Sequence, residues 1–458
     1  MPLFRIPDSD LFRADHLASV MAGLILFVIV NVTAYSSRYL AGDRNRRRQQ
    51  LLILLLGICV LCIAFADHLL VMLIAWTSSN LLLVRLMIHK AEWMAARNSG
   101  LLALKTFGIG ITFLGAGFWL LAETAGTASI SGMISATDAV TTGTTTTDTV
   151  TSMKFWGLLS VALAAMTQSA AWPFHRWLIS SLNSPTPVSA LMHAGLINGG
   201  GFLIVRFGPL YATQPVLLHG LFVVGLVTAF VGNFWKLIQT DVKRMLACST
   251  MGQMGFMLMQ CGMGLFAPAV SHLCWHGLFK AYLFLNAGSV VHEQRTVRSN
   301  GVSPARVAIA SLAGVMGVLA CSLTSGIDFH FADTGCIVGA LAFMASTQLA
   351  IGLLGTRLTI IRTIGTLIAG LGTGGLYGLN ICLVETILGS FPASSPQPMD
   401  AIYFAGLALI YLVWIAMLLN LPARLASQSS WKRLYMSALN ASQPHPQTVT
   451  ATRASYRS

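Results

Sequence analysis

The sequence predicts an all-α integral membrane protein with about thirteen transmembrane helices, and three observations support this. Of its 458 residues, 55% are hydrophobic and only 9% are charged, whereas a soluble domain carries about 25% charged residues. The same composition excludes an intrinsically disordered chain, which needs low hydrophobicity and high charge. The apolar stretches are long and continuous rather than alternating, so they predict helices and not the strands of a barrel.

Each apolar stretch is close to the roughly 20 helical residues that cross a hydrocarbon core. The predicted spans cover residues 17–35, 50–66, 69–89, 101–122, 153–171, 186–206, 216–236, 244–263, 268–291, 303–323, 335–354, 363–388 and 400–421. Residues 1–16 form an N-terminal segment, and residues 124–149 form a Thr-rich outer loop that we expect to be flexible. The polar residues 423–458 are expected to be a disordered cytoplasmic tail.

The net charge of +13 follows the topology of these spans. Lys and Arg gather in every second loop, as in residues 44–48 after the first span and residues 243–244 after the seventh. Because cytoplasmic loops are enriched in Lys and Arg, the N-terminus is predicted outside and the C-terminus in the cytoplasm. Basic residues interleaved with aromatics, as a nucleic-acid groove needs, do not occur in a soluble segment. Nucleic acid is therefore not an expected partner.

One predicted span, residues 268–291, carries three ionisable side chains on one face. His272, His276 and Lys280 follow one another at intervals of four residues, and each interval turns a helix by about 400° and raises it by about 6 Å. The side chains therefore form a slowly drifting stripe whose gaps one or two waters can bridge. Ionisable residues within a transmembrane span are energetically costly, so their presence suggests a function, and histidine titrates near neutral pH. The stripe predicts a proton relay; polar packing against neighbouring helices is the alternative.

Two further features indicate a polar path through the bundle. His193 lies in the sixth predicted span, just before glycines that permit close helix approach and a wet cavity. We expect it to join the stripe in ion translocation, with a packing histidine as the alternative. Pro173 is expected to break the fifth span soon after Gln168. A broken helix is tolerated at membrane depth only where it is buried in protein or lines a cavity; an interfacial cap is the alternative.

Five polar residues are expected to support this path or to line its mouth. Asp241 and Lys243 introduce the eighth span and are predicted at its cytoplasmic mouth, with Gln253 facing inward. Asp67, which opens the third span, and Gln168 complete the set.

Catalytic and metal-binding side chains are not expected in this chain. Most of its eight cysteines fall within or beside apolar stretches, and Cys59 and Cys62 form a lone C-x-x-C pair. Buried thiols of this kind usually act as small hydrophobic groups. A zinc cluster or a nucleophile paired with a base is not recognisable at membrane depth, which disfavours an integral membrane enzyme.

These residues lie in longer motifs that resemble the antiporter-like subunits of respiratory complex I, above all its L subunit, and the Mrp cation/proton antiporters. The matching stretches are residues 67–76, 169–207, 241–255 and 272–294, so the resemblance spans about residues 35–295. It implies an antiporter-like fold with two inverted five-helix repeats, each with a broken helix, and a path of ionisable residues and water. Residues 17–298 then form the proton-conducting core, and residues 299–422 form additional transmembrane helices.

The departures from that pattern concern its charged switch. The family places a Glu where this chain has Thr77, and a Lys where it has Gln168. The motif of the second broken helix is not recognisable after Arg298. We therefore expect that this chain does not run the standard cycle of complex I or the Mrp antiporters.

An L-subunit relative with these losses resembles the DabB family, the membrane subunits of two-component inorganic carbon transporters. That resemblance implies a protein of the bacterial cytoplasmic (inner) membrane that passes H⁺ or Na⁺ down its gradient. It also implies a DabA-like cytoplasmic zinc protein as partner, in which CO2 is hydrated to bicarbonate. Zinc is then expected in the partner, and no cofactor in this chain. A stand-alone or Mrp-type antiporter and a complex I-type quinone oxidoreductase subunit are the alternatives.

Overall fold

A computed structural model of the chain describes residue 3 and residues 11–140, 148–288, 303–326, 329, 332–355, 358–389, 395–425 and 427–449. Within this part, helices make up the fold, with three isolated β-bridges between connecting segments. The predicted all-α class is confirmed. Among the described residues, ten helical stretches are long and apolar enough to cross a membrane, so the predicted count of thirteen is not confirmed. The other three predicted spans coincide with helices α6, α12 and α13, which are outside that set.

The chain forms two compact units. Unit 1 comprises residues 1–262, 272–292 and 438–458, and unit 2 comprises residues 263–271 and 293–437. The helices of unit 1 are α1 (His16–Tyr39), α2 (Arg46–Phe65), α3 (Leu69–Met87), α4 (Met94–Ala125), α5 (Ile130–Val140), α6 (Asp148–Gln168), α7 (Arg176–Ile179), α8 (Thr186–Ala194), α9 (Gly199–Arg206), α10 (Gly208–Ala212), α11 (Pro215–Ile238), α12 (Val242–Gly262) and most of α13 (Phe266–Leu285).

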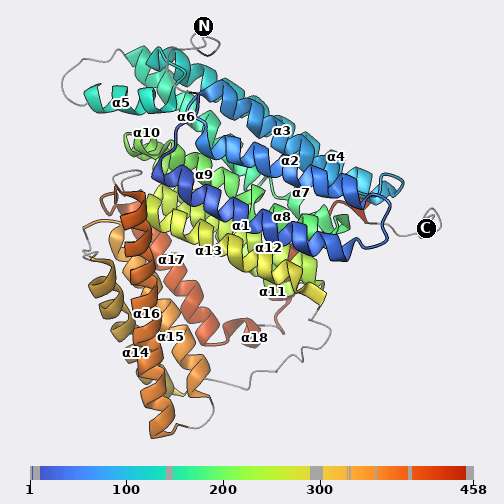
Figure 1. The fold of residues 1–458 in the computed structure, drawn as a ribbon. Helices are drawn as coiled ribbons and strands as arrows, with labels where there is room; N and C mark the ends of the chain where they lie inside the picture. Colours follow the sequence, from blue (N-terminus) through green and yellow to red (C-terminus); the bar gives the residue numbers. More distant parts are fainter. Residues whose placement is uncertain are drawn as a thin grey trace. The chain divides into compact units, whose positions relative to one another are not determined.

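Helices α1 to α4 pack in sequence order as antiparallel neighbours (Figure 1). The Asp15 side chain caps α1 by accepting a hydrogen bond from the Ala18 backbone N–H at 2.8 Å. A left-handed Gly126 ends α4, a conformation that glycine adopts without steric cost. Many apolar side chains on the outward faces of these helices are exposed, such as Val30 and Ile58. In a membrane protein those faces are the ones that meet lipid.

Helices α11 and α12 approach so closely that only glycine fits between them. A Cβ on Gly225 would lie 2.4 Å from the Met259 backbone nitrogen, and one on Gly255 would lie 2.4 Å from that of Ala229. Small residues are how membrane helices come close enough to gain packing energy. This pair holds α12, with its polar residues, in a fixed position.

The predicted break after α6 is present, and its backbone groups find partners inside the protein. Helix α6 ends at Gln168, and Ala170 has a positive φ of 49°. The Trp177 indole N–H donates to the Thr167 carbonyl at 3.0 Å, and the Trp172 backbone N–H donates to the Thr228 hydroxyl at 3.2 Å. These bonds replace those that a continuous helix would make, as non-helical backbone at membrane depth requires.

The predicted span over residues 186–206 is present as one stretch long enough to cross a membrane, but it is not one regular helix. Helix α8 ends at Ala194, Gly195 departs from helical geometry, and a 3-10 turn, η3 (Leu196–Asn198), leads into α9. The cause is the run of glycines at 195 and 199–201, because glycine favours a helix least among residues other than proline. The two breaks meet: Gln168 Nε2 donates to the Leu196 carbonyl at 3.3 Å, and the Ser169 hydroxyl donates to the Ile197 carbonyl at 3.0 Å.

Unit 2 contains helices α14 (Pro304–Ser325), α15 (Gly335–Leu354), α16 (Ile360–Leu388), α17 (Ala401–Leu418), α18 (Leu421–Leu425) and most of α19 (Ser429–Ala441). Helices α14, α15 and α16 pack against one another. A Cβ on Gly374 of α16 would overlap the Gly317 carbonyl of α14, so small residues again set the approach.

Two segments expected to lack structure are partly ordered. Residues 130–140 of the Thr-rich loop form α5, whereas residues 141–147 lie outside the described part. In the tail, α19 is followed by a 3-10 turn, η5 (Pro446–Thr448), so the prediction of disorder is wrong for residues 429–448. The physical reason is a set of polar contacts. Asn183 Nδ2 donates to the Thr448 carbonyl at 2.7 Å, and Gln239 Nε2 donates to the Ser442 hydroxyl at 2.8 Å.

Candidate ion-translocation site

The predicted stripe lies on α13, as its spacing required. The rings of His272 and His276 are 6.0 Å apart between centroids, and Lys280 follows one turn later. His276 is 6% exposed and Lys280 is 1% exposed, among the most deeply buried large side chains. A 6.0 Å separation exceeds hydrogen-bond reach of about 2.6–3.2 Å. The two rings are therefore too far apart for direct proton transfer, and a transfer between them needs at least one bridging water.

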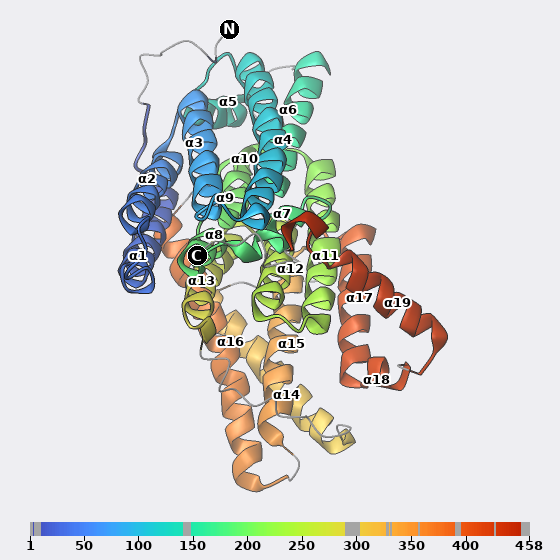
Figure 2. The ribbon, with the colours of Figure 1, turned by 90° about the vertical axis from the view of Figure 1, so that its right-hand side faces the viewer.

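His193 joins Lys280 through two groups of α12. His193 Nδ1 lies 3.0 Å from the Thr250 hydroxyl, and that hydroxyl donates to the Leu246 carbonyl at 2.9 Å. Lys280 Nζ donates to the same carbonyl at 3.4 Å. Helices α8, α12 and α13 run beside one another in unit 1 (Figure 2). A continuous set of polar contacts thus links three helices, and the structure brings together His193 and Lys280 as the sequence predicted.

The bond from the Thr250 hydroxyl to the Leu246 carbonyl favours one tautomer of His193. The Thr250 hydroxyl has one hydrogen, and it is used in the bond to the Leu246 carbonyl. The hydroxyl oxygen must then accept a hydrogen bond from Nδ1–H of His193. Nδ1 is therefore protonated in both the neutral and the charged ring, so Nε2 is the atom that gains and loses a proton. The Phe284 ring, stacked on that of His193 at 4.3 Å, holds its orientation.

Basic groups dominate the electrostatics of this site. His276 interacts electrostatically with His272, Lys280 and His193, and Lys280 interacts with Lys236. Two positive charges at this range repel each other. His276 Nε2 is buried and has no hydrogen-bond partner among the described residues. The site therefore offers the Nε2 atom of His276 as a group that can receive a proton.

A cavity lies beside the two helix breaks. Its polar lining includes Ser79, Gln168 and Asn198, and its walls are mainly apolar side chains of α1, α2 and α3. It offers about 50 Å³ to the centres of water molecules, several times the roughly 10–15 Å³ that one water needs. The Asn198 side-chain oxygen is buried without a partner in the described part of the chain. The cavity also reaches Ala194, the residue that follows His193 in the sequence.

The two positions that depart from the charged switch hold neutral hydrogen-bonded groups. The Thr77 hydroxyl donates to the Leu73 carbonyl of its own helix at 2.8 Å. Gln168 donates to η3, as described above, and lines the cavity. Neither side chain carries charge, so an ion pair between these two positions cannot form.

The remaining predicted residues lie apart from the stripe or at its edge. Asp67 accepts hydrogen bonds from the hydroxyls of Ser129 and Ser131, both at 2.7 Å, and so fastens the start of α5. Asp241 caps α12 by accepting from the Arg244 backbone N–H at 2.8 Å. Lys243 donates to the Ser184 carbonyl at 3.1 Å, which joins α12 to the turn before α8. Gln253 is half-buried on α12.

Sequence reasoning missed one buried charge. Arg206, at the end of α9, pairs with Asp15 and also donates to the Ala64 carbonyl at 2.7 Å. Its position at the very end of an apolar stretch was the available signal, because ionisable residues within spans are costly. The role of the Leu246 carbonyl left no signal at all, since a backbone group has no residue type. Within the described residues, no three His, Cys, Asp or Glu side chains form a set that could hold a metal ion.

Comparisons with known proteins place these features in context. A family model described as "NADH:quinone oxidoreductase/Mrp antiporter, TM" matches residues 66–359. A Halothiobacillus neapolitanus protein named "Probable inorganic carbon transporter subunit DabB1" is 40% identical over 285 residues, which are 61% of this chain and 50% of that protein. The NADH-quinone oxidoreductase subunit L of Escherichia coli is 30% identical over 361 residues, or 76% and 57% of the two chains.

A solved structure shares the fold. The Mrp complex from Dietzia sp. DQ12-45-1b contains a chain that matches 93% of this one with a TM-score of 0.59 and 23% identity, over 52% of its own length. The chain therefore spans about half the length of the relatives that it matches. These matches confirm the antiporter-like fold and the resemblance that the motifs indicated.

Proposed function

Because the chain belongs to the NADH:quinone oxidoreductase/Mrp antiporter transmembrane family, we propose that it translocates H⁺ or Na⁺ as the membrane subunit of an inorganic carbon uptake system. The observation that carries the proposal is the polar set His193–Thr250–Leu246 carbonyl–Lys280, continued along α13 by His276 and His272. Buried titratable groups joined by hydrogen bonds and short water gaps are what proton transfer through a protein needs.

The proposed path begins at the cavity beside the two breaks. Water there reaches the neighbourhood of His193, whose Nε2 takes and releases the proton. Lys280 is the next group, reached through the α12 hydroxyl and carbonyl, and His276 accepts at its unpartnered Nε2. A carbonyl accepts hydrogen bonds but carries no proton onward, so the step from His193 to Lys280 proceeds through water while Thr250 and Leu246 hold both side chains in place.

The inorganic carbon assignment rests on the relatives named DabB. In the proposed system this chain supplies the ion flux, and a DabA-like cytoplasmic zinc partner hydrates CO2 to bicarbonate. The inner membrane, with the N-terminus outside and the C-terminus in the cytoplasm, is the proposed location. A Mrp-type antiporter is the second candidate, favoured by the shared fold. The neutral groups at Thr77 and Gln168 disfavour it, because they cannot form the charged switch.

The test replaces Lys280 by Gln in cells that need the system, with its partner, for growth in air. Lys280→Gln is expected to abolish growth in air while growth at high CO2 continues. Lys105→Gln is the matched control, because Lys105 is an exposed lysine of α4, and it is expected to grow normally. Unimpaired growth of the Lys280→Gln cells, with normal protein level, would overturn the relay.

A biochemical experiment separates the two candidate functions. The chain is purified in mild detergent, and whatever co-elutes with it is assayed for zinc. A zinc-bearing partner in stoichiometric amount supports the carbon uptake system. A zinc-free chain that alone supports cation-dependent proton flux in liposomes supports the antiporter instead.

A further inference from the structure

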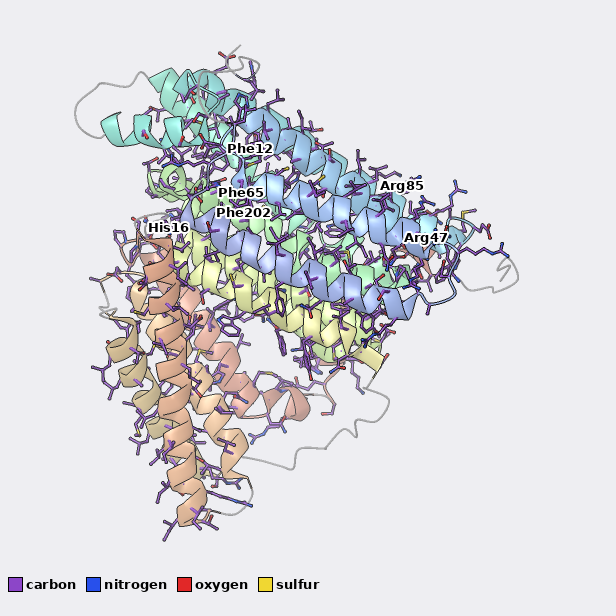
Figure 3. The ribbon with its side chains drawn as sticks, in the orientation of Figure 1. Phe12, His16, Arg47, Phe65, Arg85 and Phe202 are labelled. Atoms are coloured by element: carbon purple, nitrogen blue, oxygen red, sulfur yellow. The ribbon has the colours of Figure 1, made fainter. Side chains whose placement is uncertain are left out.

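A second pocket lies at the opposite end of α2 and α3 from Phe12 and Phe65. It is lined by Asn45, Arg48 and Gln49 at the start of α2, and by Arg85 and His89 at the end of α3. Figure 3 shows Arg47 and Arg85 at this same end of the helices. The empty space of the hollow, which is partly open to solvent, is about 220 Å³. The side chains of Arg48 and Arg85 are exposed, whereas Gln49 is buried at its base.

A role in packing or hydrogen bonding within the fold does not explain Gln49. The residue is 1% exposed, and neither its amide nitrogen nor its amide oxygen has a hydrogen-bond partner among the described residues. A buried amide without partners is destabilising, and a leucine here would be more favourable. The pocket thus presents one donor group and one acceptor group on a side chain that makes no hydrogen bond to the described residues.

The charges around the pocket select an anion. Arg48 and Arg85 line it, and α2 begins here with no side-chain cap from Asn45. The N-terminus of a helix attracts negative charge. The nearby carboxylate, Asp43, is already paired with His89 at 3.0 Å. Burial acts to raise the pKa of Asp43, but the hydrogen bonds from His89 and the Asn45 backbone N–H, together with the electrostatic interactions with His89 and Lys90, lower that pKa overall. Asp43 is therefore paired with His89 rather than with Arg48 or Arg85.

The donor and acceptor of Gln49 narrow the class of anion. Oxygens with negative charge accept hydrogen bonds from Arg48, Arg85 and the Gln49 amide nitrogen, and guanidinium groups are well suited to oxyanions. The Gln49 amide oxygen can only accept, so it needs a ligand with a hydrogen to donate. A phosphodiester of a membrane lipid has no such hydrogen, whereas bicarbonate and hydrogen phosphate each have one.

We propose that this pocket binds a small oxyanion that carries an O–H group, with bicarbonate and inorganic phosphate as its two sources. The O–H donates to the Gln49 oxygen, and the charged oxygens face Arg48 and Arg85. Binding of this kind is separate from the ion path and does not require the proposed function. Failure of one experiment therefore leaves the other unaffected.

The test measures the thermal unfolding midpoint of the purified full-length chain as anion is added at constant ionic strength, because a ligand that binds the folded state raises it. Nitrate is the matched control for bicarbonate, since it is planar, singly charged and of the same heavy-atom count but has no O–H. Bicarbonate or phosphate is expected to bind at least about tenfold more tightly than nitrate, as hydrogen bonds to charged ligands allow. The tighter of the two identifies the source.

Three variants test the residues. Arg48→Gln is expected to weaken binding at least about tenfold, whereas Arg47→Gln, next to it but outside the pocket lining, changes it less than about twofold. Gln49→Leu is expected to erase the preference over nitrate without lowering the midpoint in the absence of anion. A structural role for Gln49 predicts the reverse, a lower midpoint and an unchanged preference.

Three results would overturn the proposal. If the O–H group is recognised, the unsubstituted chain binds bicarbonate more tightly than nitrate, so equal affinity for the two anions contradicts the proposal. Equal weakening by Arg47→Gln and Arg48→Gln would indicate diffuse surface charge rather than a pocket. A midpoint that rises only with vesicles of anionic lipid, and not with bicarbonate or phosphate, would assign the arginines to the membrane surface.

Discussion

The hydroxyl of Thr250 offers the sharpest test of the ion path. Thr250→Val removes the hydroxyl while keeping a β-branched side chain of nearly the same shape. His193 Nδ1–H then loses its acceptor at 3.0 Å, and the Leu246 carbonyl loses the bond from the Thr250 hydroxyl while it keeps the bond from Lys280 at 3.4 Å. Thr250→Ser is the matched control, because it restores the hydroxyl at the same carbon. The two variants differ in one hydrogen-bonding group.

The expected magnitude follows from the burial of His193. The residue is 1% exposed, so water at the surface cannot replace the lost acceptor. A buried donor left without a partner costs about 1–3 kcal/mol, and a factor of ten in rate corresponds to about 1.36 kcal/mol. If this cost falls on proton transfer, Thr250→Val slows flux by roughly 5- to 150-fold. Thr250→Ser is expected to stay within about threefold of the unsubstituted chain.

Flux is measured in vesicles that contain the chain and its partner, with a pH-sensitive dye after a step in the proton or sodium gradient. The midpoint of thermal unfolding is measured alongside, so that a loss of folded protein is not read as a loss of flux. Wild-type flux in Thr250→Val would refute the role of this contact. Equal loss in Thr250→Val and Thr250→Ser would show that packing at the site matters and the hydroxyl does not.

Two further predictions concern stability, measured by thermal unfolding in detergent. Gly255→Ala places a Cβ 2.4 Å from the Ala229 nitrogen and should lower the stability of the folded protein by about 1–3 kcal/mol. Gly23→Ala is the control, because its Cβ meets nothing within 4 Å, and it should be neutral or slightly stabilising. Similar effects of the two variants would contradict the close approach of α11 and α12. Asp15→Ala removes the cap of α1 and the partner of Arg206, so it should lower the free energy of unfolding by about 3–5 kcal/mol. Asp15→Asn keeps a capping oxygen, so it should be less destabilising than Asp15→Ala by about 1 kcal/mol. Equal midpoints for the two Asp15 variants would exclude the cap.

Much of the fold was predictable because helical periodicity and hydropathy are local properties. The spacing of His272, His276 and Lys280 placed them on one face of α13, and the structure agrees. Pro173 indicated the break after α6 for an equally local reason. The glycines after His193 were interpreted as a packing surface, but they also interrupt the helix at Gly195. A run of glycines is compatible both with close helix packing and with a helix break, and only the elements that surround it in space decide which one occurs.

The polar residues outside the stripe show where sequence reasoning ends. Asp67 and Asp241 are predicted to support the ion path or to line its mouth, and the structure adds that both cap helices. The tail was expected to be disordered because it is polar, yet its polar groups bond to Asn183 and Gln239. In each case the partner lies in another part of the chain or is a backbone group, and residue type alone does not reveal it.

The sequence by itself determined the membrane class, the family motifs and the face of α13 that carries the titratable groups. These depend on hydropathy and on the turn of one helix, which neighbouring residues set. Only the tertiary structure decided that His193, 57 residues before Thr250 in the chain, contacts it, and that Lys280 shares the Leu246 carbonyl. Contacts of this kind form when separate helices pack, so their existence depends on close approach in space rather than on any spacing in the sequence.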